Sequence, residues 1–207
     1  MKALVLIDMQ NDFMPGGPLG VSEGDQVVPV ANSLVGCFDL VVATQDWHPP
    51  EHSSFAVNHP GHEPGEVIEV GGVSQVLWPV HCVQHTFGAE LVRDLDTSAV
   101  QQVFPKGTDP AIDSYSAFFD NAHRKSTGLG DYLKQRNVDD VYLMGLATDY
   151  CVYFSAMDAI RLGFRTTLIE DGCRGVELKS GDTRRVIDEM RAADINIALS
   201  SEVGRKA

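Results

Sequence analysis

Residues 141–163, VYLMGLATDYCVYFSAMDAIRLG, join an apolar run to a segment with helical periodicity. The run at 141–146 is apolar without alternation, which is typical of a strand buried on both faces of a parallel sheet. From residue 151 to residue 162, apolar or small residues recur at the spacing of one buried helix face, and Gly163 follows as a helix stop. The stretch therefore predicts a strand, a tight connection and a helix, with Cys151 at the junction.

The same pattern recurs along the 207-residue chain. Five further apolar runs predict strands at residues 3–7, 40–44, 100–104, 166–169 and 195–199. Helical patterns lie between them, at 24–35, within 118–135 and at 182–193. This alternation predicts a three-layer α/β/α fold around a six-stranded, mainly parallel sheet. We expect a single domain over residues 1–207, because this length suits one core.

One stretch, from Trp47 to Trp78, interrupts the alternation. It is rich in Pro, Gly and His and has little periodicity. A loop this long in a compact domain is usually functional. We therefore expect residues 47–82 to form a loop at a binding or catalytic site.

Composition narrows the choice of partners and compartment. The formal net charge is −13, which disfavours nucleic acid and anionic membranes as partners. We find no run of 18 apolar residues, and the N-terminus lacks the apolar region and cleavage site of a signal peptide, so we expect a cytoplasmic protein. The four cysteines form no CxxC pair, and a disulfide framework is not expected.

Reactive residue types stand where the predicted strands end. Asp8 follows the first strand, Asp46-Trp47-His48 the second, Lys106 the run at 100–104, and Cys151 the run at 141–146. Each alone has an ordinary explanation, such as a turn cap, a surface charge or a core thiol. Ligands of open α/β sheets bind at the carboxyl ends of the strands, so the four together favour a catalytic site.

Cys151 is the candidate nucleophile of this set. A helix N-terminus favours negative charge, so we expect the helix start and a nearby Lys106 ammonium to lower the thiol pKa. A carboxylate such as Asp8 can accept the thiol proton. The free N–H groups of a helix start can hold an oxyanion.

Asp46 and His48 also suggest a metal site, because they place an oxygen and an imidazole near one point. A third ligand is open among five histidines: His52, His59, His62, His81 and His85. His81 stands in the most constrained setting, WPVHCV at residues 78–83. Mixed nitrogen and oxygen ligands suit Zn²⁺, Mn²⁺ or Fe²⁺. The alternative is a solvated, metal-free His-rich loop.

Taken together, these stretches resemble the nicotinamidase/pyrazinamidase family of the isochorismatase-like hydrolase superfamily. The resemblance spans residues 4–176 and is carried by LVLIDMQNDFMPGGPLGV, TQDWHPPEHSSF, WPVHCVQHT, FPKGTDPAIDSYSAFFDN, MGLATDYCV and EDGCRGV. It implies a catalytic triad of Asp8, Lys106 and Cys151. It implies one divalent metal ion, Zn²⁺ first with Mn²⁺ or Fe²⁺ as alternatives, held by Asp46, His48 and His81.

The resemblance also implies how a substrate is held. The oxyanion hole falls on the N–H groups of Ala147 and Cys151, after a cis peptide between Leu146 and Ala147. The substrate ring would lie against Phe13 and Trp78, although ordinary core packing is the alternative for these two. Other substrate contacts would come from Tyr115, Leu146 and Ala147.

The resemblance leaves open a fourth metal ligand and the role of a second cysteine after a strand. Some family members carry a fourth metal ligand, often His, where this chain has Ser54, which could bind the metal through water or not at all. His52 is close in sequence but would need a different loop path. Cys173 also follows a strand, but it has no base or metal motif beside it, and we interpret it as structural.

The function implied is hydrolysis of nicotinamide to nicotinate and ammonia through a Cys thioester, as in NAD salvage, with pyrazinamide as a further substrate. Another amide hydrolase of the same fold, of the carbamoyl-amide type, is the first alternative. An isochorismatase-type hydrolase needs neither thiol nor metal. A nucleotide-binding module is disfavoured because MPGGPLG is neither GxGxxG nor a P-loop. Whether the protein is a monomer or a homo-oligomer stays open.

Overall fold

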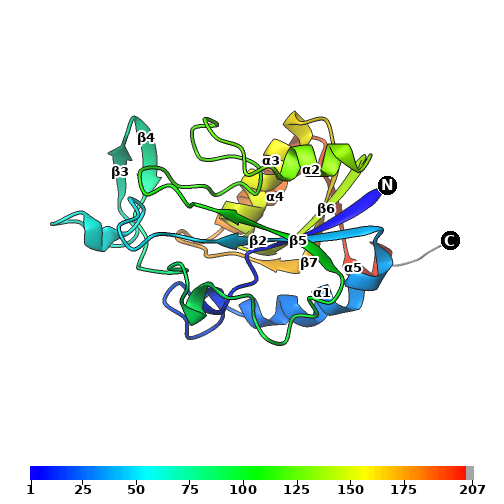
Figure 1. The fold of residues 1–207 in the computed structure, drawn as a ribbon, viewed down its shortest axis with the longest axis horizontal. Coiled ribbons are helices and arrows are strands. Elements are labelled where there is room, and N and C mark those ends of the chain that lie inside the picture. The colour runs from blue at the N-terminus through cyan, green and yellow to red at the C-terminus, as the bar shows by residue number, and fades with distance from the viewer. Residues whose placement is uncertain (204–207) are drawn as a thin grey trace.

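The computed structural model describes residues 1–203 and is built on a six-stranded sheet with the strand order β5-β2-β1-β6-β7-β8 (Figure 1). Every neighbouring pair is parallel. The strands are β1 (Lys2–Ile7), β2 (Leu40–Asp46), β5 (Val100–Lys106), β6 (Asp140–Leu146), β7 (Arg165–Arg174) and β8 (Asn196–Ala198). All six runs predicted from the sequence are strands of this sheet, which confirms the predicted fold class.

Helices cover both faces of the sheet (Figure 1). One face carries α1 (Val27–Leu34) and the short α5 (Ser200–Val203). The other carries α2 (Leu129–Gln135), α3 (Tyr153–Arg161) and α4 (Asp182–Ala192). This division follows from right-handed crossovers, because the chain moves across the sheet one way from β1 to β5 and the other way from β6 to β8.

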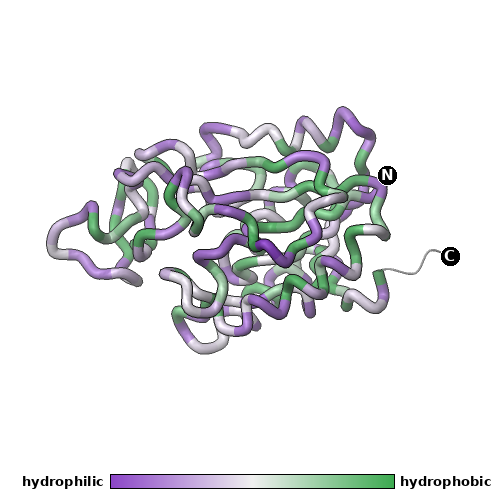
Figure 2. The backbone as a smooth tube through the Cα atoms, turned by 60° about the horizontal axis from the view of Figure 1, so that its bottom comes forward, coloured by the Kyte–Doolittle hydropathy of each residue, from purple (hydrophilic) through white to green (hydrophobic). Residues whose placement is uncertain are grey.

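The central strands form the core because nearly all their side chains are apolar and inaccessible. Residues 3–7 of β1, flanked by β2 and β6, are completely buried. Figure 2 shows hydrophobic residues concentrated in the middle of the molecule and hydrophilic ones in the outer loops. Burying such side chains contributes roughly 1.5–3 kcal/mol each, so this continuous pattern dominates the choice of fold.

The stretch expected to be only a loop contains a hairpin. β3 (Val67–Val70) and β4 (Val73–Val76) pair antiparallel in a separate two-stranded sheet. Gly71 and Gly72 join them with φ of 59° and 81°, the positive values that tight hairpin turns need. The hairpin lies beyond the end of the main sheet opposite the chain termini (Figure 1).

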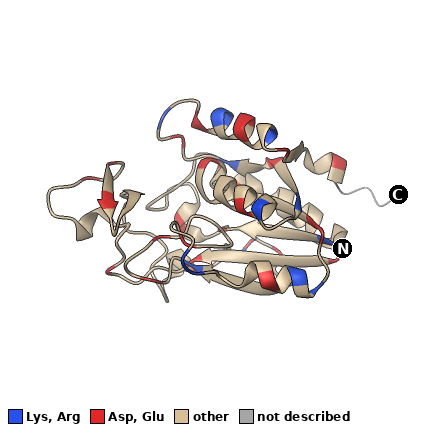
Figure 3. Ribbon diagram, turned by 90° about the horizontal axis from the view of Figure 1, so that it is seen from above, with Lys and Arg blue, Asp and Glu red and all other residues tan. Residues whose placement is uncertain are grey.

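Charged residues of both signs occur together on the outer helices (Figure 3). On α4, Arg184 pairs with Asp188 at 3.0 Å and Arg185 with Glu189 at 2.8 Å. Such exposed pairs contribute little to stability. Among residues 1–203, no helix has the length and apolar character needed to cross a membrane.

Candidate active site

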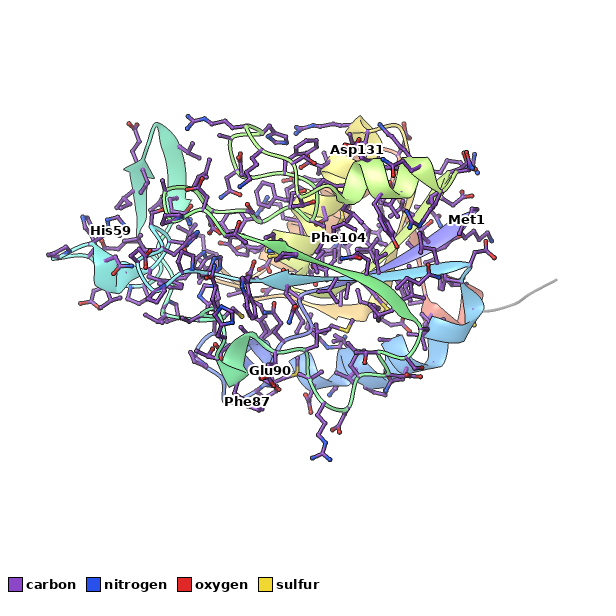
Figure 4. All side chains as sticks on the ribbon, viewed as in Figure 1. Met1, His59, Phe87, Glu90, Phe104 and Asp131 are labelled. Carbon is purple, nitrogen blue, oxygen red and sulfur yellow. The ribbon has the colours of Figure 1, made fainter. Side chains whose placement is uncertain are left out.

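The four strands that end in reactive residues are neighbours in the sheet. β5, β2, β1 and β6 lie side by side, so Lys106, Asp46, Asp8 and Cys151 meet at one edge. Asp46 and Lys106 are direct partners in the register of β2 and β5. In Figure 4, Met1 marks the opposite end of the sheet, and His59 belongs to the loops beyond the reactive edge.

Lys106 is the centre of this group. Its Nζ lies 2.9 Å from Asp8 Oδ2 and 3.4 Å from Cys151 Sγ, and it donates to Asp46 Oδ1. It also donates to the Ser114 carbonyl at 2.9 Å. Burial alone would lower the pKa of Lys106, but the carboxylates of Asp46 and Asp8 outweigh it and hold the pKa well above its usual range. Lys106 is therefore a buried cation between two carboxylates.

Asp8 is a fully buried carboxylate held by its neighbours. Its backbone is left-handed, with φ of 48°, and its N–H donates to Thr44 Oγ1 at 3.2 Å. That hydroxyl in turn donates to Asp8 Oδ1 at 2.6 Å. Burial raises the pKa of Asp8 to about 6, although Lys106 opposes the rise. Asp8 is thus a base poised near neutral pH, with an oxygen within 4.8 Å of the Cys151 sulfur.

Cys151 lies in a single π-helical turn, Thr148–Val152, that leads into α3. The expected lowering of its pKa is wrong. Burial raises the pKa of the thiol well above its usual range and outweighs the opposing Lys106 ammonium, while the Asp8 and Asp46 carboxylates raise that pKa further. The thiol consequently keeps its proton until a neighbouring base removes it.

The backbone before Cys151 has the cis peptide between Leu146 and Ala147 that the resemblance implied. The Ala147 carbonyl accepts the N–H groups of Tyr150 and Val152, each at 3.1 Å. These two bonds hold the start of the turn in which Cys151 lies.

Asp46, His48 and His81 form a buried group whose ligand atoms all lie within 4.8 Å of one another. Asp46 Oδ2 is 3.7 Å from His48 Nε2 and 3.9 Å from His81 Nε2. The other ring nitrogens, Nδ1 of each histidine, lie 2.8 Å from the carbonyls of Gly107 and Pro79. A carbonyl partner requires N–H at Nδ1, which leaves Nε2 with a lone pair for a metal.

The chemistry of this donor set fits a divalent metal such as zinc. Burial and the nearby His48 lower the pKa of His81 to about 4, so this ring is neutral at physiological pH. Burial would raise the pKa of Asp46, but Lys106 and His48 outweigh it and keep that pKa far below its usual range. One carboxylate and two imidazoles are ordinary zinc ligands.

The other histidines of the loop have different partners. The His52 ring packs on that of His48, with centroids 4.1 Å apart, and its Nδ1 lies 2.7 Å from Ser54 Oγ. His59 contacts the Ser53 carbonyl, His62 pairs with Glu66, and His85 packs edge-on against Trp47. Within residues 1–203, His52 lies outside the group of Asp46, His48 and His81 but forms a second buried group with His48 and Asp113.

A cavity opens beside Cys151. Its lining contains the expected Phe13, Trp78, Tyr115 and Ala147 together with Asp46, His81 and Cys151. It also contains four residues that sequence analysis missed: Leu19, Asp113, Tyr150 and Val176. Leu19, Asp113 and Val176 come from loops without periodicity and Tyr150 from the π-helical turn, so only the tertiary structure reveals their place in the lining.

Leu146, expected to contact the substrate, lies away from the cavity. In the described part of the chain, the cavity lining does not include this residue. Leu146 is 1% exposed, and its side chain reaches toward Gly24. Ala147, the next residue, does line the cavity.

Gln10 is a supporting residue that sequence analysis also missed. Its side-chain amide donates to the Asp46 carbonyl and accepts the Asp46 N–H, both at 2.8 Å. It also donates to the Ala89 carbonyl at 2.8 Å. The amide therefore extends the pairing of β1 and β2 beyond the strands and fixes the backbone of Asp46. A glutamine two residues after Asp8 gives no signal of this role in the sequence.

Comparison with known proteins agrees with this architecture. The family described as Isochorismatase domain matches residues 2–202. The chain is 48% identical to the nicotinamidase of Escherichia coli, over 93% of this chain and 92% of that protein.

Two solved structures are similar over almost the whole chain. The nicotinamidase/pyrazinamidase of Acinetobacter baumanii is 47% identical with a TM-score of 0.94, and the match covers 97% of both chains. The pyrazinamidase of Pyrococcus horikoshii, solved in complex with zinc, is 39% identical with a TM-score of 0.78, covering 96% of this chain and 98% of that one. The chain therefore belongs to the isochorismatase family, in the branch that contains the nicotinamidases.

Proposed function

We propose that the protein is a metal-dependent amidohydrolase that converts nicotinamide to nicotinate and ammonia, and that also hydrolyses pyrazinamide. The observation that carries this proposal is the contact of one buried ammonium, Lys106 Nζ, with Asp8, Asp46 and Cys151 Sγ. It joins a base and a thiol to a candidate metal ligand beside a cavity with aromatic walls. The names of the full-length relatives in Escherichia coli and Acinetobacter support the same activity.

The reaction uses Cys151 as nucleophile and Asp8 as proton carrier. Asp8 takes the thiol proton as Sγ forms a bond to the carboxamide carbon. The C–N bond then breaks, and Asp8 returns the proton to the departing ammonia, leaving a thioester. Asp8 next takes a proton from water as the water oxygen bonds to the thioester carbon. The C–S bond breaks, Asp8 returns this proton to the sulfur, and the acid product loses its own proton to solvent to leave as nicotinate. Lys106 stays charged and holds Asp8 beside the sulfur.

The N–H groups of Ala147 and Cys151 are proposed to stabilise the oxyanion formed when sulfur attacks. Both residues line the cavity, and the bonds from the Tyr150 and Val152 N–H groups to the Ala147 carbonyl hold the turn that carries them, which supports this role. Losing one such donor typically costs roughly 100-fold or more in kcat.

The metal site would be formed by Asp46, His48 and His81, with zinc as the first choice. The zinc in the Pyrococcus pyrazinamidase structure supports this assignment. A bound metal would supply a Lewis-acid anchor for the pyridine nitrogen and so orient the ring. Phe13 and Trp78 would flank that ring from the cavity wall.

Metal removal tests this assignment. We expect exhaustive chelation to abolish ammonia release and added Zn²⁺, Mn²⁺ or Fe²⁺ to restore it. His81→Ala should lower the affinity for the metal roughly 10-fold or more, because one of three ligands is lost. Metal content measured by mass spectrometry gives a readout independent of turnover. Full activity in protein stripped of metal would contradict the assignment.

The pH dependence follows from Asp8. The base must be ionised to accept the thiol proton, and its pKa is raised to about 6. We expect kcat/KM to fall about tenfold for each pH unit below that value and to level off above it. Initial rates of ammonia release between pH 4.5 and 8 measure this. A profile that stays flat down to pH 5 would exclude Asp8 as the base.

Substrate preference distinguishes this activity from its alternatives. Ammonia release is compared for nicotinamide, pyrazinamide and a carbamoyl amide at equal concentration. We expect the two aromatic amides to be hydrolysed and the carbamoyl amide to be a poor substrate. Turnover of the carbamoyl amide alone would overturn the proposal.

A further inference from the structure

Gln75 is a buried amide in a largely exposed hairpin. It lies on β4 and is 3% exposed, whereas its neighbour Ser74 is exposed. The hairpin belongs to a separate sheet beyond the end of the main one (Figure 1). A buried polar side chain on such an element needs partners, and Gln75 finds them in the wall of the catalytic cavity.

The amide of Gln75 joins two cavity-lining residues. The two N–H groups of its Nε2 are shared among three acceptors: the Val76 carbonyl at 2.7 Å, Asp113 Oδ2 at 3.1 Å and Tyr115 Oη at 3.1 Å. Tyr115 Oη accepts a second hydrogen bond, from Trp78 Nε1 at 3.2 Å. Three residues that line the cavity are thus connected through one that stands behind them.

Asp113 and Tyr115 need such an anchor because they belong to the irregular connection between β5 and α2. The buried Asp113 carboxylate accepts one backbone bond, from Ser114 N–H at 2.8 Å, and the Gln75 amide supplies a further donor. An amide nitrogen suits both a carboxylate and a phenol oxygen, because it donates without adding charge.

We propose that Gln75 is a positioning residue that sets the slot for the substrate ring by holding Tyr115, Trp78 and Asp113 in place. This inference rests on the proposed function. Among residues 1–203, the side-chain hydrogen bonds of Gln75 go to Val76, Asp113 and Tyr115 and not to Asp8, Lys106 or Cys151, so we expect it to act on ring binding and not on the chemical steps.

Gln75→Glu tests the inference, because it replaces the donating amide by a carboxylate facing Asp113 and the Tyr115 oxygen. We expect KM for nicotinamide to rise about tenfold or more, since buried donors and acceptors lose their partners, while kcat changes less than about threefold. Ser74→Glu adds the same charge one residue away on the exposed side of β4 and should leave both constants unchanged. Gln75→Met removes the donor without adding charge and should raise KM in the same direction.

A double-mutant cycle separates positioning from general destabilisation. In Tyr115→Phe the phenol oxygen is absent, so Gln75→Met should raise KM by a smaller factor there than in the wild-type background. Equal factors in the two backgrounds, unchanged KM in both Gln75 variants, or a loss confined to kcat would overturn the inference. Absence of nicotinamide hydrolysis by the wild type would overturn the proposed function itself, which separates the two failures.

Discussion

Replacing Cys151 by alanine is expected to lower kcat for nicotinamide by roughly 10,000-fold or more, as losses of a covalent nucleophile do in other hydrolases. The reason is that the sulfur forms the bond to the acyl carbon, and neither Asp8 nor Lys106 can replace it. The fold should persist, because alanine removes one buried sulfur atom and leaves the π-helical turn intact. Ammonia release and thermal unfolding measure the two effects separately.

Cys173→Ala is the matched control for that substitution. Cys173 is also buried, within β7, and its thiol donates to the Ile169 carbonyl at 3.3 Å. Burial raises the pKa of Cys173 to about 12, so it carries a proton. We expect its alanine variant to keep the wild-type rate. A Cys151→Ala variant that keeps most of its activity would exclude thiol catalysis.

Lys106→Met should have the largest effect on stability. Its ammonium lies between the buried carboxylates of Asp8 and Asp46, with side chains 0% and 6% exposed. Removing the cation leaves two buried carboxyl groups without their partner, and breaking such a buried ion pair costs about 3–5 kcal/mol. Activity should fall as well, because the pKa of Asp8 rises further without the Lys106 charge and the base becomes protonated at neutral pH.

Urea unfolding of the metal-loaded and metal-free proteins measures the stability change. The loss should be greater without metal, since a bound cation would partly compensate the charge of Asp46. Lys179→Met, which removes an exposed lysine, serves as control and should be nearly neutral. A Lys106→Met protein that is as stable and as active as the wild type would refute the central role given to this ammonium.

The sheet was predictable because the amino-acid composition of its strands reflects their burial. Strands β1 and β6 lie inside the sheet, so their residues must be apolar on both faces, and a continuous apolar run is diagnostic. The β3–β4 hairpin escaped prediction because its strands have four residues each and are half exposed. Its composition therefore resembles that of the surrounding loop.

The reactive residues were predictable for a similar reason, because parallel strands bring their carboxyl ends to one edge. The sequence does not reveal that β5, β2, β1 and β6 are adjacent. The candidate residues can still be identified without the strand order, because only a few residues follow the predicted strands. The thiol pKa was predicted with the wrong sign because local charge was weighed without burial. Gln10 and Gln75 were missed because each acts through partners distant in the sequence.

The most direct test of the thioester mechanism is mass spectrometry of protein quenched during turnover of nicotinamide, followed by peptide mapping of the four cysteines. We expect a nicotinoyl group on Cys151 and on no other cysteine, and we expect it to disappear when the substrate is exhausted. A nicotinoyl group on Cys173 or Cys82 in actively turning-over protein, with Cys151 unmodified, would contradict the account.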